Sequence, residues 1–259
     1  MKTLGVIASR YGSSRLPGKA LKDICGRPMV WWVYYSVRNA DGLDKLVVAT
    51  DDQRIVDVCD KFGIESMMTS AEHREAANRL YEVSRSIEAD YYIQINGDEP
   101  LLSSDYVSAV IPDFVDVNRE YGANLIAKMH NPVEVMDTSN IKVVFDDDMN
   151  TCYMSRTPIP YPYRSIEFEY YKHIGIIGYT KKMLDFYAEH GPGRFERIEG
   201  IATLRFTDYG KELKCIEVQD MNSLSVDTQM DLDHVRIVIK EKLDSGELAE
   251  YKRLIELGA

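Results

Sequence analysis

A short apolar segment near the N-terminus leads into a loop whose residue types are suited to phosphate binding. Thr3–Ile7 is rich in branched residues, and the loop ASRYGSSRLPGK that follows contains glycines, serines and three cations, namely Arg10, Arg15 and Lys19. Glycines let the backbone approach a ligand closely, hydroxyls and amides donate hydrogen bonds, and cations neutralise charge. The loop matches neither the G-x-x-x-x-G-K-[ST] nor the G-x-G-x-x-G nucleotide signature. On composition alone, a basic surface turn stiffened by Pro17 explains it equally well.

Two aspartates further along the chain could act on the same phosphates. Asp98 stands in Gly-Asp-Glu-Pro directly after the apolar run Tyr91–Ile95, and Asp227 stands in Ser-Val-Asp-Thr. Carboxylates at strand ends are natural ligands for a hard metal ion that bridges phosphates. Each also has an ordinary explanation, since Asp98 fits an exposed turn and Asp227 or Thr228 fits the N-cap of the helix that follows. The pair is more specific than either member.

The sequence of the N-terminal loop strongly resembles the signature of CMP-Kdo synthetases, the CTP-dependent cytidylyltransferases that activate an acidic sugar. Their pattern reads close to P-A-R-x-x-S-x-R-x-P-x-K, and here Ala8 and Ser9 stand in the Pro and Ala positions. The Gly-Asp-Glu-Pro-Leu and Val-Asp-Thr segments also match family motifs, with Asn96 where the family has Gln. The resemblance covers essentially the whole chain.

The resemblance assigns roles to the residues of these motifs. It implies catalysis by Arg10, Lys19, Asp98 and Asp227, and a Mg²⁺ ion held by Asp98 and Asp227. It implies CTP binding by the loop and by two positions outside it: Ala8, Ser9, Arg10, Ser13, Arg15, Lys19, Arg79 and Asn96. A preference for cytosine rests on the resemblance, because no local feature reads the base independently.

Three further residues are implied in binding the acceptor. Arg156, in Ser-Arg-Thr-Pro-Ile-Pro-Tyr-Pro, is suited to a carboxylate or phosphate, and its ordinary alternative is a surface arginine stacked on the Tyr/Pro segment. Lys-His-Ile-Gly-Ile matches the family's K-H-x-G-I and places His173 near the acceptor, together with Tyr179. A lone histidine on a strand is more often a hydrogen-bonded structural residue.

The acceptor motifs also depart from the family pattern. The Ser-Gly-Thr-Asp core of the family's H-x-S-G-T-D-R motif is absent from this chain, and so are a Glu-Gln pair and an aromatic residue. The residues that stand at these altered positions are Ala76, Ala77, Asn78, Ile177, Ala202 and Thr203. A site built for hydroxyls discriminates through those hydrogen bonds, so their loss indicates a different acceptor. The nucleotide half matches well and the acceptor half does not.

Composition narrows the class of protein. The 259 residues carry a net charge of −11, which argues against nucleic acid or an anionic membrane as a partner. The four cysteines form no CxxC, no signal peptide precedes the first strand, and no segment reaches the length of a membrane span. We therefore expect a cytoplasmic protein without a disulfide framework or zinc site.

The order of elements predicts an α/β fold of the nucleotide-diphospho-sugar-transferase type, with a mixed, mostly parallel sheet flanked by helices. Strands are expected at 3–7, 45–50, 64–68 and 91–95, with helices between them from 29, after Asp51-Asp52 and at 73–87. Later strands are expected at 123–129, 141–145, 151–154, 170–179 and 213–218, with helices at 181–189, 196–204 and 230–244. The chain is one domain, 1–259, with a smaller lobe at about 124–180 through which the family typically dimerises, so a homodimer is expected.

Three functions remain open from the sequence. The first is transfer of CMP from CTP to a Kdo-like sugar acid, with release of pyrophosphate. The second is the same chemistry on a non-Kdo acid, such as a phosphorylated small molecule (phosphoglutamine, for example), and the departures slightly favour it. The third is a non-catalytic nucleotide-binding paralogue, against which the retention of both aspartates and all loop cations argues.

Overall fold

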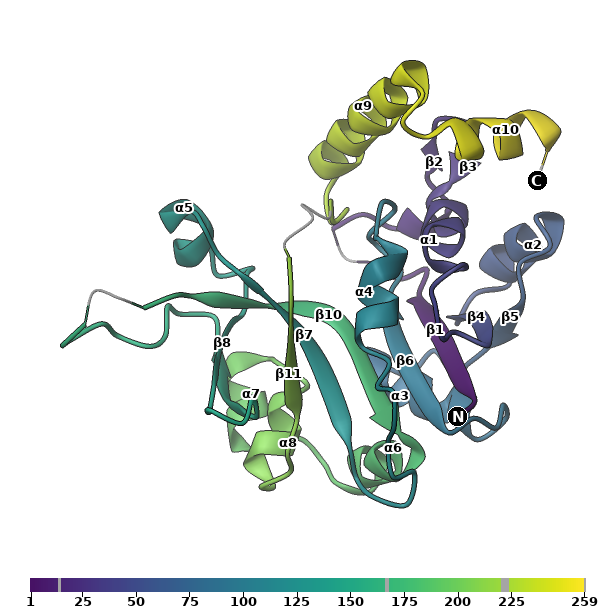
Figure 1. The fold of residues 1–259 in the computed structure, drawn as a ribbon. Coiled ribbons are helices and arrows are strands. Elements are labelled where there is room, and N and C mark those ends of the chain that lie inside the picture. The colour runs from purple at the N-terminus through teal and green to yellow at the C-terminus, as the bar shows by residue number, and fades with distance from the viewer. Residues whose placement is uncertain (14, 166–167, 220–223, 259) are drawn as a thin grey trace.

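The computed structural model describes residues 1–13, 15–165, 168–219 and 224–258, and Ser14 of the phosphate loop lies outside these ranges. A nine-stranded mixed sheet runs through the molecule, with the central order β11-β7-β10-β6-β1-β4-β5 (Figure 1). The strands of this path are β1 Thr3–Ser9, β4 Lys45–Thr50, β5 Ser66–Met68, β6 Tyr91–Asn96, β7 Gly122–Lys128, β10 Tyr171–Thr180 and β11 Lys214–Val218. Strand β1 pairs in parallel with both β4 and β6, whereas β10 is antiparallel to both of its neighbours on the path. The expected mixed, mostly parallel sheet is confirmed.

The remaining strands leave this path. Strands β8 (Lys142–Phe145) and β9 (Thr151–Ser155) form an antiparallel hairpin that joins the sheet through the start of β10. Two short strands, β2 (Asp23–Ile24) and β3 (Arg27–Pro28), form a separate small sheet that the sequence did not reveal. The segment 124–180 thus contributes β7 and β10 to the main sheet and β8 and β9 beside it.

Helices cover both faces of the sheet (Figure 1). They are η1 Lys19–Leu21, α1 Met29–Val37, α2 Gln53–Lys61, α3 Ala76–Ser84, α4 Ser104–Ala109, α5 Pro132–Met136, α6 Lys181–Glu189, α7 Arg194–Glu199, α8 Leu204–Asp208, α9 Gln229–Ser245 and α10 Ala249–Leu257. Because side chains alternate along a strand, neighbouring residues of β1 enter different cores. Ile7 packs with Trp31 and Trp32 of α1, while Val6 packs with Leu80 of α3.

Two expected helices differ from the structure. The helix predicted over 73–87 begins only at Ala76, because the side chains of His73 and Glu82 pair and hold the preceding segment in a non-helical turn. The helix predicted over 196–204 is divided into α7 and α8, since Gly200 adopts a left-handed conformation with φ of 65°. Both differences lie beside the cavities described next.

Candidate active site

Three parallel strands end at the same edge of the sheet and bring distant motifs together. Ala8 of β1 lies opposite Ala49 of β4 and Asn96 of β6. Gly97, the residue after β6, lies very close to β1. A Cβ added to it would be 2.7 Å from the Ala8 carbonyl oxygen. The glycine of the Gly-Asp-Glu-Pro motif therefore allows the turn carrying Asp98 to lie against the start of the phosphate loop.

The phosphate loop is held by its own backbone and by a buried ion pair. The Tyr11 carbonyl accepts hydrogen bonds from the amides of Ser13 and Gly18, and the Tyr11 amide donates to Asp51 at 3.1 Å. Asp51 also pairs with Arg79 at 3.1 Å, and Arg79 donates to Thr69 as well. Since only 3% of Arg79 is exposed, this arginine fixes the loop from beneath through Asp51.

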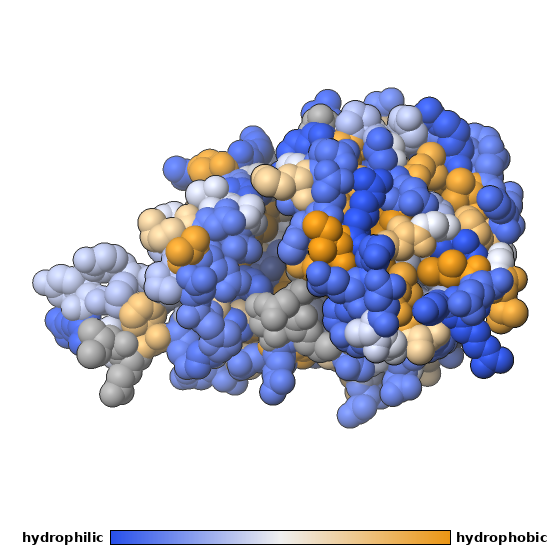
Figure 2. All heavy atoms as spheres, turned by 90° about the horizontal axis from the view of Figure 1, so that it is seen from above, coloured by the Kyte–Doolittle hydropathy of each residue, from blue (hydrophilic) through white to orange (hydrophobic). Residues whose placement is uncertain are grey.

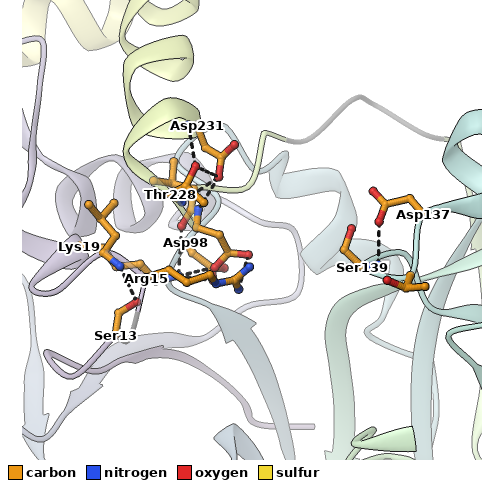
Figure 3. A network of polar contacts seen from close by, with 12 residues as sticks. Ser13, Arg15, Lys19, Asp98, Asp137, Ser139, Thr228 and Asp231 are labelled. Carbon is orange, nitrogen blue, oxygen red and sulfur yellow. Dashed lines mark hydrogen bonds and ion pairs between the residues drawn. The ribbon is translucent and has the colours of Figure 1, made fainter.

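Lys19 joins the two aspartates that the sequence singled out. Its Nζ lies 2.7 Å from Asp98 Oδ2 and 3.3 Å from Asp227 Oδ1, and it also donates to the Val226 carbonyl. Arg15 reaches the other oxygen of Asp227 at 2.9 Å. The Val226 amide donates to the Asp98 carbonyl at 2.8 Å, so the backbones of both segments are joined too. Figure 3 shows this cluster at the start of α9.

Thr228 rather than Asp227 caps helix α9. The Thr228 side chain accepts from the Asp231 amide, and the Asp231 carboxylate accepts in turn from the Thr228 amide, forming a capping box (Figure 3). The helix-capping role that the sequence also allowed for Asp227 is therefore filled by Thr228. The Asp227 carboxylate remains available to Arg15 and Lys19.

A cavity of about 350 Å³ opens beside this cluster. Its lining contains every residue expected to bind CTP or metal: Ala8, Ser9, Arg10, Ser13, Arg15, Lys19, Arg79, Asn96, Asp98 and Asp227. It also contains His73, Arg74 and Glu75, from the turn before α3. Arg74 was missed because it occupies a variable position of the motif. Figure 2, which views the molecule from the end where α9 lies, shows a hollow rimmed mainly by hydrophilic residues.

A second cavity of about 200 Å³ adjoins the first and shares Glu75, Ala76 and Asn96 with it. His173 and Tyr179, the two strand residues expected at the acceptor, both line it. So do most of the altered positions, namely Ala76, Ala77, Ile177, Ala202 and Thr203. Tyr187 and Gln94 line it too, although the sequence gave no reason to select them. Apolar spacing made Tyr187 indistinguishable from a core residue of α6.

Arg156 lies elsewhere than the sequence led us to expect. Its guanidinium donates to the carbonyls of Glu199, Thr138 and Gly200, and it is absent from the described lining of both cavities. The Glu199 carboxylate accepts from the Arg156 amide and from Ser155. In this structure Arg156 fastens the end of α7 to β9. An acceptor role would require it to leave these carbonyls, and that role stays a prediction.

Two groups of the second cavity are buried without a hydrogen-bond partner in the described chain, His173 Nδ1 and the Tyr187 hydroxyl. Burial lowers the pKa of His173 to about 4, so the imidazole is neutral at pH 7. Burial also raises the pKa of Tyr187, an effect that Arg205 opposes and Glu196 and Glu75 reinforce. Unpaired buried polar groups are costly, and a polar ligand could satisfy them.

Asp98 and Asp227 are the two carboxylates of the first cavity that could bind a metal ion. No group of three or more metal-ligating side chains occurs among the described residues. Mg²⁺, however, is commonly bound through one or two carboxylates and completed by water and substrate phosphates. Asp98 and Asp227 supply such hard oxygens, and both contact a single ammonium, that of Lys19. This donor set fits Mg²⁺ bound together with a nucleotide.

Comparison with known proteins places the chain in a class. The family described as cytidylyltransferase matches residues 4–215. A 3-deoxy-manno-octulosonate cytidylyltransferase of Fusobacterium nucleatum is 38% identical over 93% of this chain and 98% of its own, and one of Escherichia coli is 35% identical over the same shares. The chain belongs to the cytidylyltransferase family and is a CTP-dependent nucleotidyltransferase. Within that family, it is similar to CMP-Kdo synthetases.

Solved structures agree with this placement. CMP:2-keto-3-deoxy-manno-octonic acid synthetase complexed with CTP matches with a TM-score of 0.88 at 35% identity, over 94% of this chain and 100% of that one. The inositol-1-phosphate CTP transferase of T. maritima shares the fold, with a TM-score of 0.64 at 17% identity. Among the sequence relatives, an 8-amino-3,8-dideoxy-manno-octulosonate cytidylyltransferase of Shewanella frigidimarina is 36% identical over 90% of this chain and 96% of its own.

No described helix is long and apolar enough to span a membrane.

Proposed function

We propose that the protein transfers CMP from CTP to an oxygen of a small acid and releases pyrophosphate. The observation that carries the proposal is the joining of Asp98 and Asp227 by Lys19 at the wall of a basic cavity, beside a second cavity that shares Asn96. One cavity offers charges for a triphosphate and the other offers room for an acceptor. Transfer at phosphorus depends mainly on such positioning and charge neutralisation.

In the proposed reaction an acceptor oxygen forms a bond to the α-phosphorus of CTP. The bond from that phosphorus to the α,β-bridging oxygen breaks, and pyrophosphate leaves with the electron pair. The proton of a hydroxyl acceptor passes to solvent. Arg10, Arg15 and Lys19 hold the triphosphate, while Ser13 and the backbone around Ala8 and Ser9 position the nucleotide.

Asp98 and Asp227 would hold Mg²⁺, which, when bound, neutralises phosphate charge. Lys19 supports this site, because its ammonium contacts the Asp98 and Asp227 carboxylates at 2.7 and 3.3 Å and keeps them together. Lys19 also lines the cavity that would hold the phosphates. Arg79 contributes through Asp51 by fixing the loop that carries the other cations.

For the acceptor we propose a sugar acid of the 3-deoxy-octulosonic type, or a relative modified on the sugar. The named activities of similar proteins support this choice. The second candidate is a phosphorylated small molecule, in which case a phosphoryl oxygen attacks and a pyrophosphate-linked product forms. What favours it is the second cavity, where Ala76, Ala77 and Ala202 stand at altered positions.

The test is pyrophosphate release from CTP and Mg²⁺ with a panel of acids, using UTP and ATP as control nucleotides. The panel contains 3-deoxy-manno-octulosonate, its 8-amino derivative, sialic acid and phosphorylated small molecules. Turnover that disappears in Asp98→Ala and Asp227→Ala supports the proposal. Tight CTP binding with no pyrophosphate release from any acid would instead favour the non-catalytic paralogue.

We also propose a homodimer formed through the segment 124–180. Large apolar side chains are exposed there, on Val133, Met136, Tyr161 and Tyr163. Such side chains commonly mark an interface. Light scattering coupled to gel filtration should give twice the 29.6 kDa chain mass. A Met136→Glu variant should shift the population toward the monomer, and a monomeric wild-type protein would contradict this proposal.

A further inference from the structure

Lys19 has two sets of partners that compete for its ammonium group. An ammonium has three N–H donors. In this structure its Nζ donates to Asp98 Oδ2 at 2.7 Å, to the Val226 carbonyl at 3.1 Å and to Asp227 Oδ1 at 3.3 Å. The phosphates that Lys19 would hold in the proposed reaction therefore need a donor that is already in use.

The same ammonium competes with a metal ion for the two carboxylates. Asp98 and Asp227 each place an oxygen within 3.3 Å of Lys19 Nζ. Mg²⁺ bonds such oxygens at about 2.0 to 2.1 Å, so an ion bonded to both would lie beside the ammonium. The Lys19 side chain is only 14% exposed, and like charges in contact repel strongly where water screens them poorly. Lys19 in this position therefore weakens metal binding.

The carboxylate pair does not depend on Lys19 alone for its position. The Val226 amide donates to the Asp98 carbonyl at 2.8 Å, and the Asp227 amide donates to the Asp231 carboxylate at 3.1 Å. These backbone bonds join the two segments and fix the start of α9 without Lys19. The lysine itself has a flexible four-carbon stem and lines the cavity, so its ammonium can turn toward a bound ligand.

We propose that Lys19 stands in for Mg²⁺ in the nucleotide-free protein, and that it exchanges the two carboxylates for phosphate oxygens when nucleotide and metal bind. Lys19 is thus a positioning residue for the metal site as well as a phosphate ligand. The inference rests on the nucleotide and metal roles proposed above for the first cavity.

This exchange couples the binding of nucleotide and metal. A phosphate that draws Lys19 away leaves Asp98 and Asp227 free for a metal ion, and a metal ion on these carboxylates frees the donors of Lys19 for the phosphate. Each ligand should therefore raise the affinity of the other, by the same factor in both directions. Metal alone should bind the free protein weakly.

The first experiment measures metal binding without nucleotide, so that it does not depend on turnover. Mn²⁺ replaces Mg²⁺, and the free ion is followed by electron paramagnetic resonance at pH 8. Lys19→Met should bind Mn²⁺ about tenfold more tightly than wild type or better, since a like charge in contact with both carboxylates is removed. Arg15→Met should give a smaller gain, because Arg15 contacts Asp227 alone and is largely exposed.

Lys22→Met is the matched control for net charge. It removes one lysine charge three residues along the chain, and Lys22 is absent from the described lining of both cavities. Its Mn²⁺ affinity should equal that of wild type. Circular dichroism confirms that each variant is folded, and a gain of affinity cannot arise from unfolding.

The second experiment observes the exchange directly by crystallography. The protein is crystallised alone and with Mg²⁺ and a CTP analogue that has a methylene bridge between the α- and β-phosphorus, which prevents turnover. Lys19 Nζ should contact both carboxylates in the free protein. In the complex it should bond to a phosphate oxygen and no longer contact both Asp98 and Asp227.

Three outcomes would overturn the inference: Mn²⁺ affinity in Lys19→Met no higher than in wild type, an equal gain in Lys22→Met, or a complex in which Lys19 keeps both carboxylates. Failure of the proposed function is distinguishable. Exchange at Lys19 without pyrophosphate release from CTP with any acid contradicts the reaction alone. Pyrophosphate release by a protein whose Lys19 keeps both carboxylates contradicts the inference alone.

Discussion

The two cavities share Glu75, Ala76 and Asn96, but their walls differ in kind. The first cavity, proposed for the nucleotide, is lined by cations and carboxylates that pair with one another, as Lys19 pairs with Asp98 and Asp227. The second cavity, proposed for the acceptor, is lined mostly by small and apolar side chains, with the carboxylate of Glu75, a neutral histidine and a tyrosine hydroxyl that has no hydrogen-bond partner among the described residues. We infer from this contrast that charge placement would determine the reaction, whereas shape and a few polar groups would determine the acceptor.

The largest effect is expected at the ion pair beneath the phosphate loop. Arg79→Met should lower the free energy of unfolding by about 3 to 5 kcal/mol, because it leaves the Asp51 carboxylate without its buried partner. Thermal and urea denaturation measure the change. The control is Lys240→Met, which removes an exposed pair with Asp244 on α9 and should hardly change stability. An equal loss of unfolding free energy in Arg79→Met and Lys240→Met would show that the buried Asp51–Arg79 pair stabilises the phosphate loop no more than an exposed pair stabilises α9.

The next largest effect is expected at the carboxylates. Asp98→Asn should reduce kcat/KM about 10²- to 10³-fold, since it removes one carboxylate oxygen from the site proposed to hold the Mg²⁺ ion that would offset phosphate charge. Steady-state pyrophosphate release at several Mg²⁺ concentrations measures it, and the requirement for Mg²⁺ should rise. Asp41→Asn, on an exposed turn after α1, is the control. Activity of the Asp98 variant within a few-fold of wild type would remove the proposed metal site.

This contrast also separates what the sequence could predict from what it could not. Buried parallel strands such as β1 and β6 are mainly apolar runs, so their positions and the edge where they end could be read from the sequence. Charged motifs at that edge then had to converge, and the structure brings all of them to one cavity. The short helices α4 and α5 span too few residues to show a clear period.

The acceptor side was less predictable because its contacts depend on folding. The motif around Arg156 gave a residue type, but its bonds to the carbonyls of Glu199 and Gly200 arise only where α7 ends at a left-handed glycine. Tyr187 followed the apolar period of α6, and only the structure shows that its hydroxyl reaches a cavity. Backbone partners and unpaired groups leave no mark on a sequence pattern.

A smaller effect is expected where the cavities meet. An added Cβ at Gly175 of β10 would collide with the side-chain amide of Asn96, which lines both cavities. Gly175→Ala should therefore displace Asn96 and cost about 1 to 3 kcal/mol, as overpacking does. It should also raise KM for both substrates in the same assay. Gly191→Ala is a matched control, because nothing lies within 4 Å of its Cβ position. A rise in KM for one substrate only would show that Asn96 serves one cavity.

The last effect concerns the pH dependence of stability and the buried, neutral His173 of the second cavity. Its pKa in the folded protein is about 4, against an ordinary value of 6.5. Between these values the unfolded chain binds a proton that the folded chain does not, so acid favours unfolding. The free energy of unfolding should rise with pH from about 4 to 6.5, with His173 contributing at most about 1.4 kcal/mol per pH unit.

Comparing denaturation of wild type and His173→Gln across this range isolates that contribution, because the other titrating groups are common to both proteins. The variant should show a shallower pH dependence below 6.5 and the same dependence above it. If the two curves stay parallel, the imidazole is solvated in the folded state, and the acceptor cavity is wetter than its burial indicates. Such a cavity would discriminate acceptors less sharply, because water would compensate for the hydrogen bonds that the wrong acceptor fails to make.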